Sequence, residues 1–466
     1  MSAQVIVIRR AELPEGIRDV EIRDGRVAAV APDLPAAGAE VVDGAGAALL
    51  PGLHDHHLHL HAMAAAAGSV SCGPPEVHTA DELGSALRGA VGDSWIRGVG
   101  YVETVAGLLD SNGIDRYVRE RPVRLQHRSG ALWFLNSRAA ELVGLAGADH
   151  PGIERDGRGA PTGRLWRADD WLRTRLPDRS PPDLGLIGDR LARFGITGVT
   201  DATPDLSPTS LRSLVEAHVD GALPQCLHLL GAPADDRDDR PHGITVGPYK
   251  IVLADSDLPD YQQLRATVHT VHEQGRAVAV HCVSRIGLLL LLAVFDDIGS
   301  IPGDRIEHGA VIPDESLDRI RGLGVCVVTQ PGFIAHRGDD YLQRVDPSDV
   351  PYLYRCRSLM DNDIPVALSS DAPYGPADPW AVIAAARWRR APDGRIVGAD
   401  ERISSARALD RYLTTPQQPG GVVRAVRVGE PADLVLLDRP RAEMLDDPSS
   451  DMVRCTMIRG RVAFDR

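Results

Sequence analysis

Residues 48–61 read Ala-Leu-Leu-Pro-Gly-Leu-His-Asp-His-His-Leu-His-Leu-His and join an apolar run to a cluster of histidines around one aspartate. The apolar run, Ala48–Leu53, is typical of a buried strand. If the backbone stays extended beyond it, side-chain alternation separates two groups, one with Asp55, His57, His59 and His61, the other with His54 and His56. The segment therefore predicts a strand that ends in potential metal ligands, without deciding which of them bind.

Short apolar runs alternate with helical stretches downstream of this segment, as in parallel α/β folds. Predicted helices include Pro208–Val219, Tyr261–Gln274, Glu315–Leu323 and Pro379–Arg389. The predicted strands are Ala48–Leu53, Val123–His127, Thr197–Asp201, Gln225–Leu230, Tyr249–Leu253, Ala277–His281, Arg305–His308, Val325–Thr329 and Pro365–Ser369. A (β/α)8 barrel has eight strand positions, one fewer than these candidates.

The stretch from about His61 to Gly185 is too long for a single crossover helix, so we interpret it as an insertion and assign Val123–His127 to it. Both ends of the chain are rich in short β-runs, which indicates that the termini meet in one small sheet domain. We therefore predict a distorted TIM (β/α)8 barrel (51–66 and 186–412), an insertion after its first strand (67–185), and a small β-sandwich (1–50 and 413–466).

Residues able to bind a metal fall at the predicted carboxyl ends of barrel strands, where catalytic groups of such barrels sit. Asp201 and Thr203 also fall at such an end, and two long predicted loops, Ala232–His242 and Gln330–Tyr352, add to this face. Imidazole and carboxylate together suit a borderline divalent ion such as zinc. The candidate ligand set is His57, His59, Lys250, His281, His308 and Asp371.

Lys250 is the single lysine in a chain that has 51 lysine and arginine residues together. Arginine and lysine are equivalent on a solvated surface, but only the amine loses its proton readily when buried and then acts as a nucleophile. A position that keeps lysine in so arginine-rich a chain is a candidate for amine chemistry.

Several segments together resemble the amidohydrolase superfamily, and more narrowly the amidohydrolase 3 family (YtcJ-like, N-substituted formamide deformylase-like). The signature Pro-Gly-hydrophobic-x-Asp-x-His-x-His is matched by Pro51–Leu60, and it selects His57 and His59 as the ligand pair. The resemblance runs nearly end to end, and its other matching segments are Arg305–His308, Ser370–Pro373, Val428–Asp438, Pro161–Gly163, Asn136–Ser137 and Gly195–Thr197.

The resemblance implies one or two Zn²⁺ ions, with His57, His59 and Asp371 on one ion and His281 and His308 on the other. Lys250, carboxylated by carbon dioxide, would bridge the two. Arginine cannot replace it, because a guanidinium does not deprotonate in proteins. Asp371 is then the general base and acid, while His308 or His281 helps to hold the carbonyl oxygen if only one ion is present.

The chain departs from this family after Arg121-Pro122-Val123, where many relatives carry Asp-Gly-His and this sequence has Ser129-Gly130-Ala131. We expect neighbouring residues to bind the substrate instead, since Arg128 in particular suits a carboxylate. The candidate substrate-binding residues are His127, Arg128, Tyr101, His336 and Tyr374.

The predicted function is metal-dependent hydrolysis of a C–N bond in an amide, formamide or cyclic amide. One alternative is a deaminase of an amidine or heterocyclic amine, which commonly has one metal and no bridging lysine. A second is a non-catalytic protein on the same scaffold. A serine-triad hydrolase is disfavoured, because the sequence has no Gly-x-Ser-x-Gly elbow.

The composition of the chain indicates which kinds of binding partner to expect. The net charge of −14 argues against nucleic acid and acidic membrane surfaces, so a small-molecule substrate is expected. The most apolar run, Ile286–Phe295, is too short to span a bilayer, and we expect no signal peptide. Six cysteines without a Cys-x-x-Cys pair favour a reduced, cytoplasmic protein, and a homodimer is the default assembly.

Overall fold

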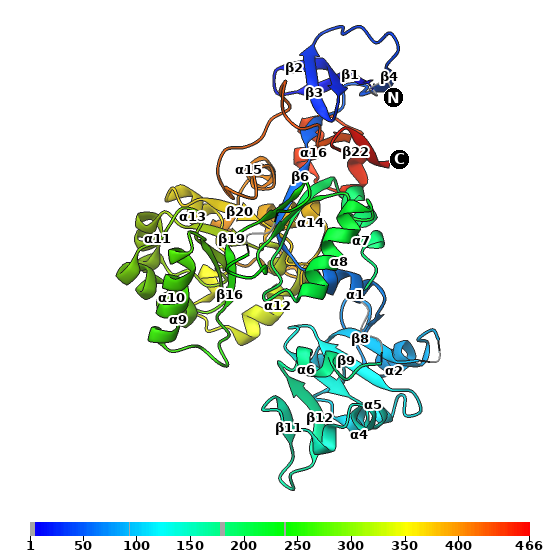
Figure 1. Ribbon diagram of the computed structural model, residues 1–466, viewed down its shortest axis with the longest axis vertical. Coiled ribbons are helices and arrows are strands. Elements are labelled where there is room, and N and C mark those ends of the chain that lie inside the picture. Colours follow the sequence, from blue (N-terminus) through cyan, green and yellow to red (C-terminus); the bar gives the residue numbers. More distant parts are fainter. Residues whose placement is uncertain (1–4, 93, 178–181, 237–238) are drawn as a thin grey trace. The chain divides into compact units, whose positions relative to one another are not determined.

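The computed structural model describes residues 5–92, 94–177, 182–236 and 239–466 (Figure 1). The chain divides into two compact units, one formed by the residues up to Leu60 and from Leu184 onward, the other by His61–Asp183. Each unit mixes helices and strands, as expected of an α/β protein. No helix among the described residues is long and apolar enough to cross a membrane.

Parallel strands form the centre of the first unit. One sheet has the order β15-β14-β13-β6 and the other the order β16-β17-β18-β19-β20, and all neighbours within each are parallel. The strands of the first sheet are β6 (Leu53–Leu58), β13 (Ile196–Asp201), β14 (Cys226–Leu229) and β15 (Ile244–Val246). Those of the second are β16 (Tyr249–Val252), β17 (Val278–Cys282), β18 (Arg305–His308), β19 (Cys326–Thr329) and β20 (Val366–Leu368).

The two parallel sheets are linked at two places. The Lys250 amide donates to the Leu230 carbonyl at 3.2 Å, which links the end of β14 to β16, and β20 lies beside β6. Strands β13 and β18 are buried along their whole length, as parallel strands covered on both faces are. The carboxyl ends of β6, β18 and β20 are thereby brought together.

Helices connect the parallel strands, and α9, α10 and α11 follow one another along one flank of the second sheet (Figure 1). Their starts have local causes: Ser207 caps α8 ahead of a proline in its first turn, and Asp260 with Gln263 forms a capping box on α9. The helices are α7 (Gly185–Arg193), α8 (Pro208–Val219), α9 (Tyr261–Glu273), α10 (Arg285–Ile298), α11 (Leu317–Leu323), α12 (Gly332–Arg344), α13 (Arg357–Asp361), α14 (Pro379–Trp388), α15 (Ser405–Asp410) and α16 (Arg441–Asp446).

Two further sheets come from the two ends of the chain. Their orders are β3-β2-β1-β4 and β23-β22-β21-β5, and alternate side chains of both pack into one apolar cluster. The strands are β1 (Val5–Leu13), β2 (Gly16–Arg23), β3 (Arg26–Ala31), β4 (Glu40–Asp43), β5 (Leu49–Pro51), β21 (Leu434–Leu437), β22 (Val453–Ile458) and β23 (Arg461–Asp465).

The second unit contains one mixed sheet, of order β11-β12-β10-β9-β8-β7, with its own apolar core. Its strands are β7 (Val70–Ser71), β8 (Ile96–Tyr101), β9 (Val123–His127), β10 (Leu132–Leu135), β11 (Ile153–Arg155) and β12 (Pro161–Trp166). Its longest helix, α2 (Ala80–Arg88), begins with a capping box in which Thr79 and Glu82 satisfy each other's backbone amides.

The predicted strand Ala48–Leu53 is wrong as a single element. The structure ends β5 at Pro51, where it pairs antiparallel with β21, and starts β6 at Leu53, which pairs parallel with β13. Gly52 separates them because a Cβ atom there would lie 2.2 Å from the Thr197 side chain. As a result, Asp55 and His57 lie within the strand, not after it.

The predicted loop Gln330–Tyr352 is also wrong, since α12 occupies Gly332–Arg344. Pro331 and Gly332 at the start of this helix are residues typical of loops, so the sequence does not indicate a helix there. Phe333 and Tyr341 have a spacing that fits one face of a helix. The predicted loop Ala232–His242 has no helix or strand among its described residues, and residues 237–238 lie outside them. It is followed by β15, a strand that the sequence did not predict.

Candidate metal centre

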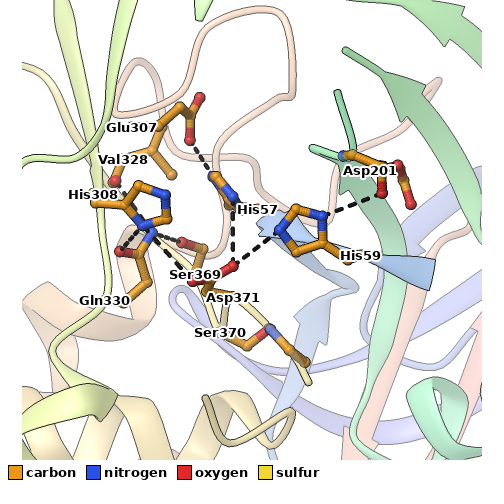
Figure 2. A network of polar contacts seen from close by, with 12 residues as sticks. His57, His59, Asp201, Glu307, His308, Val328, Gln330, Ser369, Ser370 and Asp371 are labelled. Atoms are coloured by element: carbon orange, nitrogen blue, oxygen red, sulfur yellow. Dashed lines mark hydrogen bonds and ion pairs between the residues drawn. The ribbon is translucent and has the colours of Figure 1, made fainter. Parts of the chain in front are cut away.

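Three potential ligands converge at the carboxyl ends of β6 and β20. One ligand atom from each of His57, His59 and Asp371 lies within 4.8 Å of the other two. Asp371 Oδ1 is 3.2 Å from His59 Nε2 and 3.6 Å from His57 Nε2 (Figure 2). Two imidazoles and a carboxylate at this spacing are a donor set that suits a divalent transition metal.

Backbone and buried carboxylate contacts fix these groups. The Asp371 amide donates to the His57 carbonyl at 2.8 Å. Asp55 Oδ1 accepts the amides of His57 at 3.1 Å and Ser370 at 3.2 Å, so one carboxylate holds both the strand and the loop. Burial raises the pKa of Asp55 to about 7. Contacts within the protein therefore position these ligands without a bound ion.

Glu307 on β18 orients the His57 ring. His57 Nδ1 makes a hydrogen bond to Glu307 Oε2 (Figure 2). Arg305 Nε lies 2.5 Å from Glu307 Oε1. Burial holds the pKa of His57 well below its usual value, so the ring is neutral. In the neutral ring, Nδ1 carries the proton and donates a hydrogen bond to Glu307. The other ring nitrogen, Nε2, is then unprotonated and faces Asp371.

His308 and His281 extend this arrangement. The His308 ring lies 4.7 Å from the His57 ring and 4.3 Å from the His281 ring, measured between centroids. Its Nδ1 is 3.0 Å from Gln330 Oε1 and 3.8 Å from Asp371 Oδ2. Burial keeps the pKa of His308 well below its usual value. The four predicted histidines thus lie in one continuous group.

Lys250 on β16 is buried, with 4 % of its surface exposed, and its Nζ has no hydrogen-bond partner among the described residues. Burial lowers the pKa of Lys250, although the Glu307 and Asp371 carboxylates oppose that effect. The pKa of His57 is lowered mainly by burial and next by the charge of Lys250. Lys250 is therefore an amine that burial drives toward its neutral, nucleophilic form.

The residues present fit a divalent ion, because buried polar atoms without partners gather where an ion would bind. His57 Nε2, Asp371 Oδ1 and Lys250 Nζ are all buried and lack hydrogen bonds within the part of the chain that is described. Leaving such atoms unsatisfied is costly, and coordination would satisfy the first two.

The predicted substrate-binding residues divide between the two units. The Tyr374 ring lies 5.5 Å from the His59 ring, whereas His336 is exposed on α12. Three others belong to the second unit. There the fully buried Tyr101 donates to the Gly107 carbonyl at 2.6 Å, and His127 Nδ1 lies 2.7 Å from the Ser129 hydroxyl; Arg128 follows β9.

Sequence reasoning gave no role to Glu307, Gln330 or Asp55. Glu307 stands in the quoted Arg-Ile-Glu-His segment and Asp55 in the histidine-rich segment, so both were visible next to predicted ligands. Gln330 follows β19 directly, and its amide also donates to the Ser369 hydroxyl at 2.9 Å. A search for polar residues within each strand and directly after it would have found all three.

A cavity of about 280 Å³ lies at the opposite, amino ends of the strands. Its lining includes His54 at the start of β6, Gly198 early in β13, and the Arg424 and Asp433 side chains. None of the candidate ligands lines it, so this cavity is separate from the metal centre.

Comparison with known proteins gives a family. The model of the amidohydrolase family matches residues 40–464. The N-substituted formamide deformylase of Arthrobacter pascens is 26 % identical, covering 96 % of this chain and 95 % of that protein. YtcJ of Bacillus subtilis (strain 168), which is named an amidohydrolase, is 24 % identical and covers 74 % of each chain. The resemblance found in the sequence is confirmed.

Solved structures show the fold. An uncharacterized metal-dependent hydrolase from Pyrococcus horikoshii OT3 superposes with a TM-score of 0.73 at 20 % identity, covering 94 % of this chain and 98 % of its own. Likeness at this identity shows that the chain shares a fold with a metal-dependent hydrolase, and leaves the reaction to be argued from the site.

Proposed function

Because the chain belongs to the amidohydrolase family, we propose that it is a metal-dependent hydrolase that cleaves the C–N bond of an amide, formamide or cyclic amide. The observation that carries the proposal is the convergence of His57, His59 and Asp371, with buried atoms that lack protein partners. The formamide deformylase of Arthrobacter pascens, similar over nearly its whole length, supports the same class of bond.

We assign one or two Zn²⁺ ions to this centre. His57, His59 and Asp371 would hold the first ion, and His281 and His308 the second. Lys250 would hold both ions as a carbamate: its neutral amine would attack the carbon of carbon dioxide, an N–C bond would form as one C=O π bond breaks and leaves its electron pair on oxygen, and the proton lost from nitrogen would pass to solvent. The buried Nζ without a hydrogen-bond partner and the lowered pKa of Lys250 both support this chemistry.

When bound, the metal would polarise the substrate carbonyl and make a water molecule more acidic. Asp371 takes the proton of the attacking water and later delivers it to the leaving nitrogen, acting as base and then as acid. Glu307 keeps the proton of His57 on Nδ1, and Gln330 holds the His308 ring near Asp371. Asp55 fixes the Asp371 loop throughout.

We also infer that the parallel strands close into the predicted barrel, since β14 is linked to β16 and β20 lies beside β6. The two terminal sheets, which share one apolar cluster, support the predicted sandwich. In such a barrel the carboxyl ends of the strands carry the active site, in agreement with the place of the metal centre.

The test is a product assay on zinc-loaded protein with N-(2-phenylethyl)formamide, hydantoin and cytosine. We expect formate from the first or a ring-opened carbamoyl acid from the second, and no product with an Asp371→Asn variant. Ammonia from cytosine without cleavage of either amide would instead assign a deaminase. Zinc-loaded protein that turns over no amide in a broad panel would contradict the proposal and favour a non-catalytic role.

A further inference from the structure

Arg337 interrupts α12 and folds over an aromatic surface. Its backbone leaves the helical region (φ −153°, ψ 28°) within the helix Gly332–Arg344. The guanidinium carbon lies 4.0 Å from the Phe333 ring centroid and 5.9 Å from that of Tyr341. Phe333 and Tyr341 lie four residues before and four residues after this break. The cation is therefore held against an apolar surface, not extended into solvent.

The charge of Arg337 has no counter-charge close by. No carboxylate of the described residues lies within 4.0 Å of its guanidinium, and its buried Nε has no hydrogen-bond partner among them. Arg389, buried nearby, is different: it donates to the Val397, Tyr354 and Leu353 carbonyls at 2.7, 2.9 and 2.6 Å. Apart from the Tyr341 hydroxyl, Arg337 has no such acceptor among the described residues, and a partly desolvated cation is costly unless a ligand supplies acceptors.

Aromatic side chains connect Arg337 to the metal centre. The Tyr374 ring contacts the His59 ring edge-on, and Tyr374 packs in the same apolar cluster as Phe333 and Tyr354. Gly375 tightens this connection, because a Cβ atom there would lie 2.9 Å from Phe333 Cε1.

The electrostatics agree with this proximity. Burial alone would lower the pKa of Arg337, but Tyr341, Tyr354 and Asp371 raise it. The guanidinium is thus close enough to be influenced by the central carboxylate of the metal centre, and it stays charged.

We propose that Arg337 binds a carboxylate of the substrate, so that the substrates are amides that carry both an anionic group and an apolar group. This inference rests on the proposed hydrolase function. The apolar group would lie on Tyr374. A guanidinium that lies over an aromatic ring, as that of Arg337 does over Phe333, can donate two parallel hydrogen bonds from its edge to a carboxylate.

The experiment compares two substrates that differ only in a carboxylate, N-formylphenylalanine (both enantiomers) and N-(2-phenylethyl)formamide, with wild type, Arg337→Met, Arg337→Lys and Arg344→Gln. Arg344 is an exposed arginine on the same helix and serves as the matched control. Binding of phenylacetate and of phenylacetamide, measured by calorimetry, gives a readout that needs no turnover. Metal content and melting temperature are measured for every variant.

For Arg337→Met we expect KM for N-formylphenylalanine to rise about tenfold or more, as the loss of charge-assisted hydrogen bonds implies, while kcat/KM for the neutral formamide is kept. Phenylacetate should bind wild type and Arg344→Gln but lose affinity by a similar factor in Arg337→Met. Arg337→Lys should fall between, since it keeps the charge but not the two-pronged geometry.

Equal effects of Arg337→Met on the charged and neutral compounds, at unchanged metal content, would overturn the anion-binding role and leave the hydrolase proposal standing. If phenylacetate binds in an Arg337-dependent way but no amide is hydrolysed, the hydrolase proposal is overturned and the anion-binding role of Arg337 stands. If Arg337→Met does not fold, Arg337→Lys decides: no loss of phenylacetate affinity in that variant overturns the inference.

Discussion

Two sets of histidines on the parallel sheets are chemically alike but have different surroundings. In the first set, which we call the threonine-bound histidines, each ring contacts a threonine hydroxyl: His54, His56 and His228 at 2.9, 3.0 and 2.7 Å. In the second set, the site histidines, each ring lies within 4.0 Å of Asp371: His57, His59 and His308.

The difference teaches what separates a structural histidine from a candidate ligand. Burial lowers the pKa of His54, His56 and His228 just as it lowers that of His57 and His308. A neutral buried ring is therefore common to both sets. No carboxylate of the described residues lies within 4.0 Å of a threonine-bound ring, whereas the site histidines share one. The shared carboxylate is the feature that distinguishes them.

Removing that carboxylate's charge should have the largest effect. Asp371→Asn keeps the size of the side chain but removes the proposed base and weakens a proposed ligand. We expect kcat to fall by about 10²–10⁴-fold. Steady-state kinetics on the substrate identified above, with metal content measured alongside, checks this. His54→Gln, at a threonine-bound histidine on β6, is the control that should keep turnover. Full activity of Asp371→Asn would remove the distinction between the two sets.

Lys250→Arg tests the proposed bridge between the ions. The guanidinium keeps the positive charge but cannot become a carbamate, so metal should fall from about two ions per chain to about one, with most of the activity lost. Mass spectrometry of the intact protein under carbon dioxide should also lose any added carboxyl group. A variant with wild-type metal and turnover would show that Lys250 is not a bridge.

Glu307→Gln should have an intermediate effect. The glutamine amide is neutral and accepts the hydrogen bond from His57 more weakly than the Glu307 carboxylate does. The His57 ring is therefore less firmly oriented and less basic. Metal affinity should weaken by about 10–100-fold, with the fold unchanged. Competition with a chelator of known affinity measures it. Unchanged affinity would mean that the contact between Glu307 and His57 is structural only.

The smallest effect is expected at a threonine-bound histidine, where pH should alter stability and leave metal binding alone. Burial lowers the pKa of His228 to about 3, against 6.5 in a free chain. As pH falls below 6.5, His228 becomes protonated in the unfolded chain but stays neutral in the folded protein. The free energy of unfolding therefore decreases as pH falls toward 3. At pH 5 this amounts to about 2 kcal/mol.

His228→Asn removes this source of acid sensitivity. The free energy of unfolding of wild type minus that of the variant should decrease between pH 7.5 and pH 5, as measured by chemical denaturation. His269→Asn, at an exposed position, controls for the substitution itself. A difference that is constant with pH would show that His228 does not resist protonation in the folded protein.

The sequence predicted some parts of this arrangement well for physical reasons. β9 and β18 have the predicted bounds, because proline or glycine lies within three residues of both ends of each segment. The break between β5 and β6 was not predictable, since it depends on Gly52 lying against Thr197, a long-range contact. α12 was missed because Pro331 and Gly332 signal a loop while the helix is stabilised by packing.

The candidate site shows the same limit. Residue types and strand ends were enough to group His57, His59 and Asp371, which the structure brings together. Alternation along the strand separated His54 and His56 from His57 and His59, but it could not show that threonines bind the first pair, because Thr200 and Thr414 lie far away in sequence. Partners supplied by tertiary structure decide which histidines remain available.

Metal analysis of two double variants tests the central claim most directly. Protein grown with zinc supplied is purified as wild type, as His57→Asn/His59→Asn, and as the control His54→Gln/His56→Gln, and metal per chain is measured by mass spectrometry. We expect bound zinc in wild type and in the control, and none in the site variant. Wild type without metal, or a site variant that keeps it, would contradict the account.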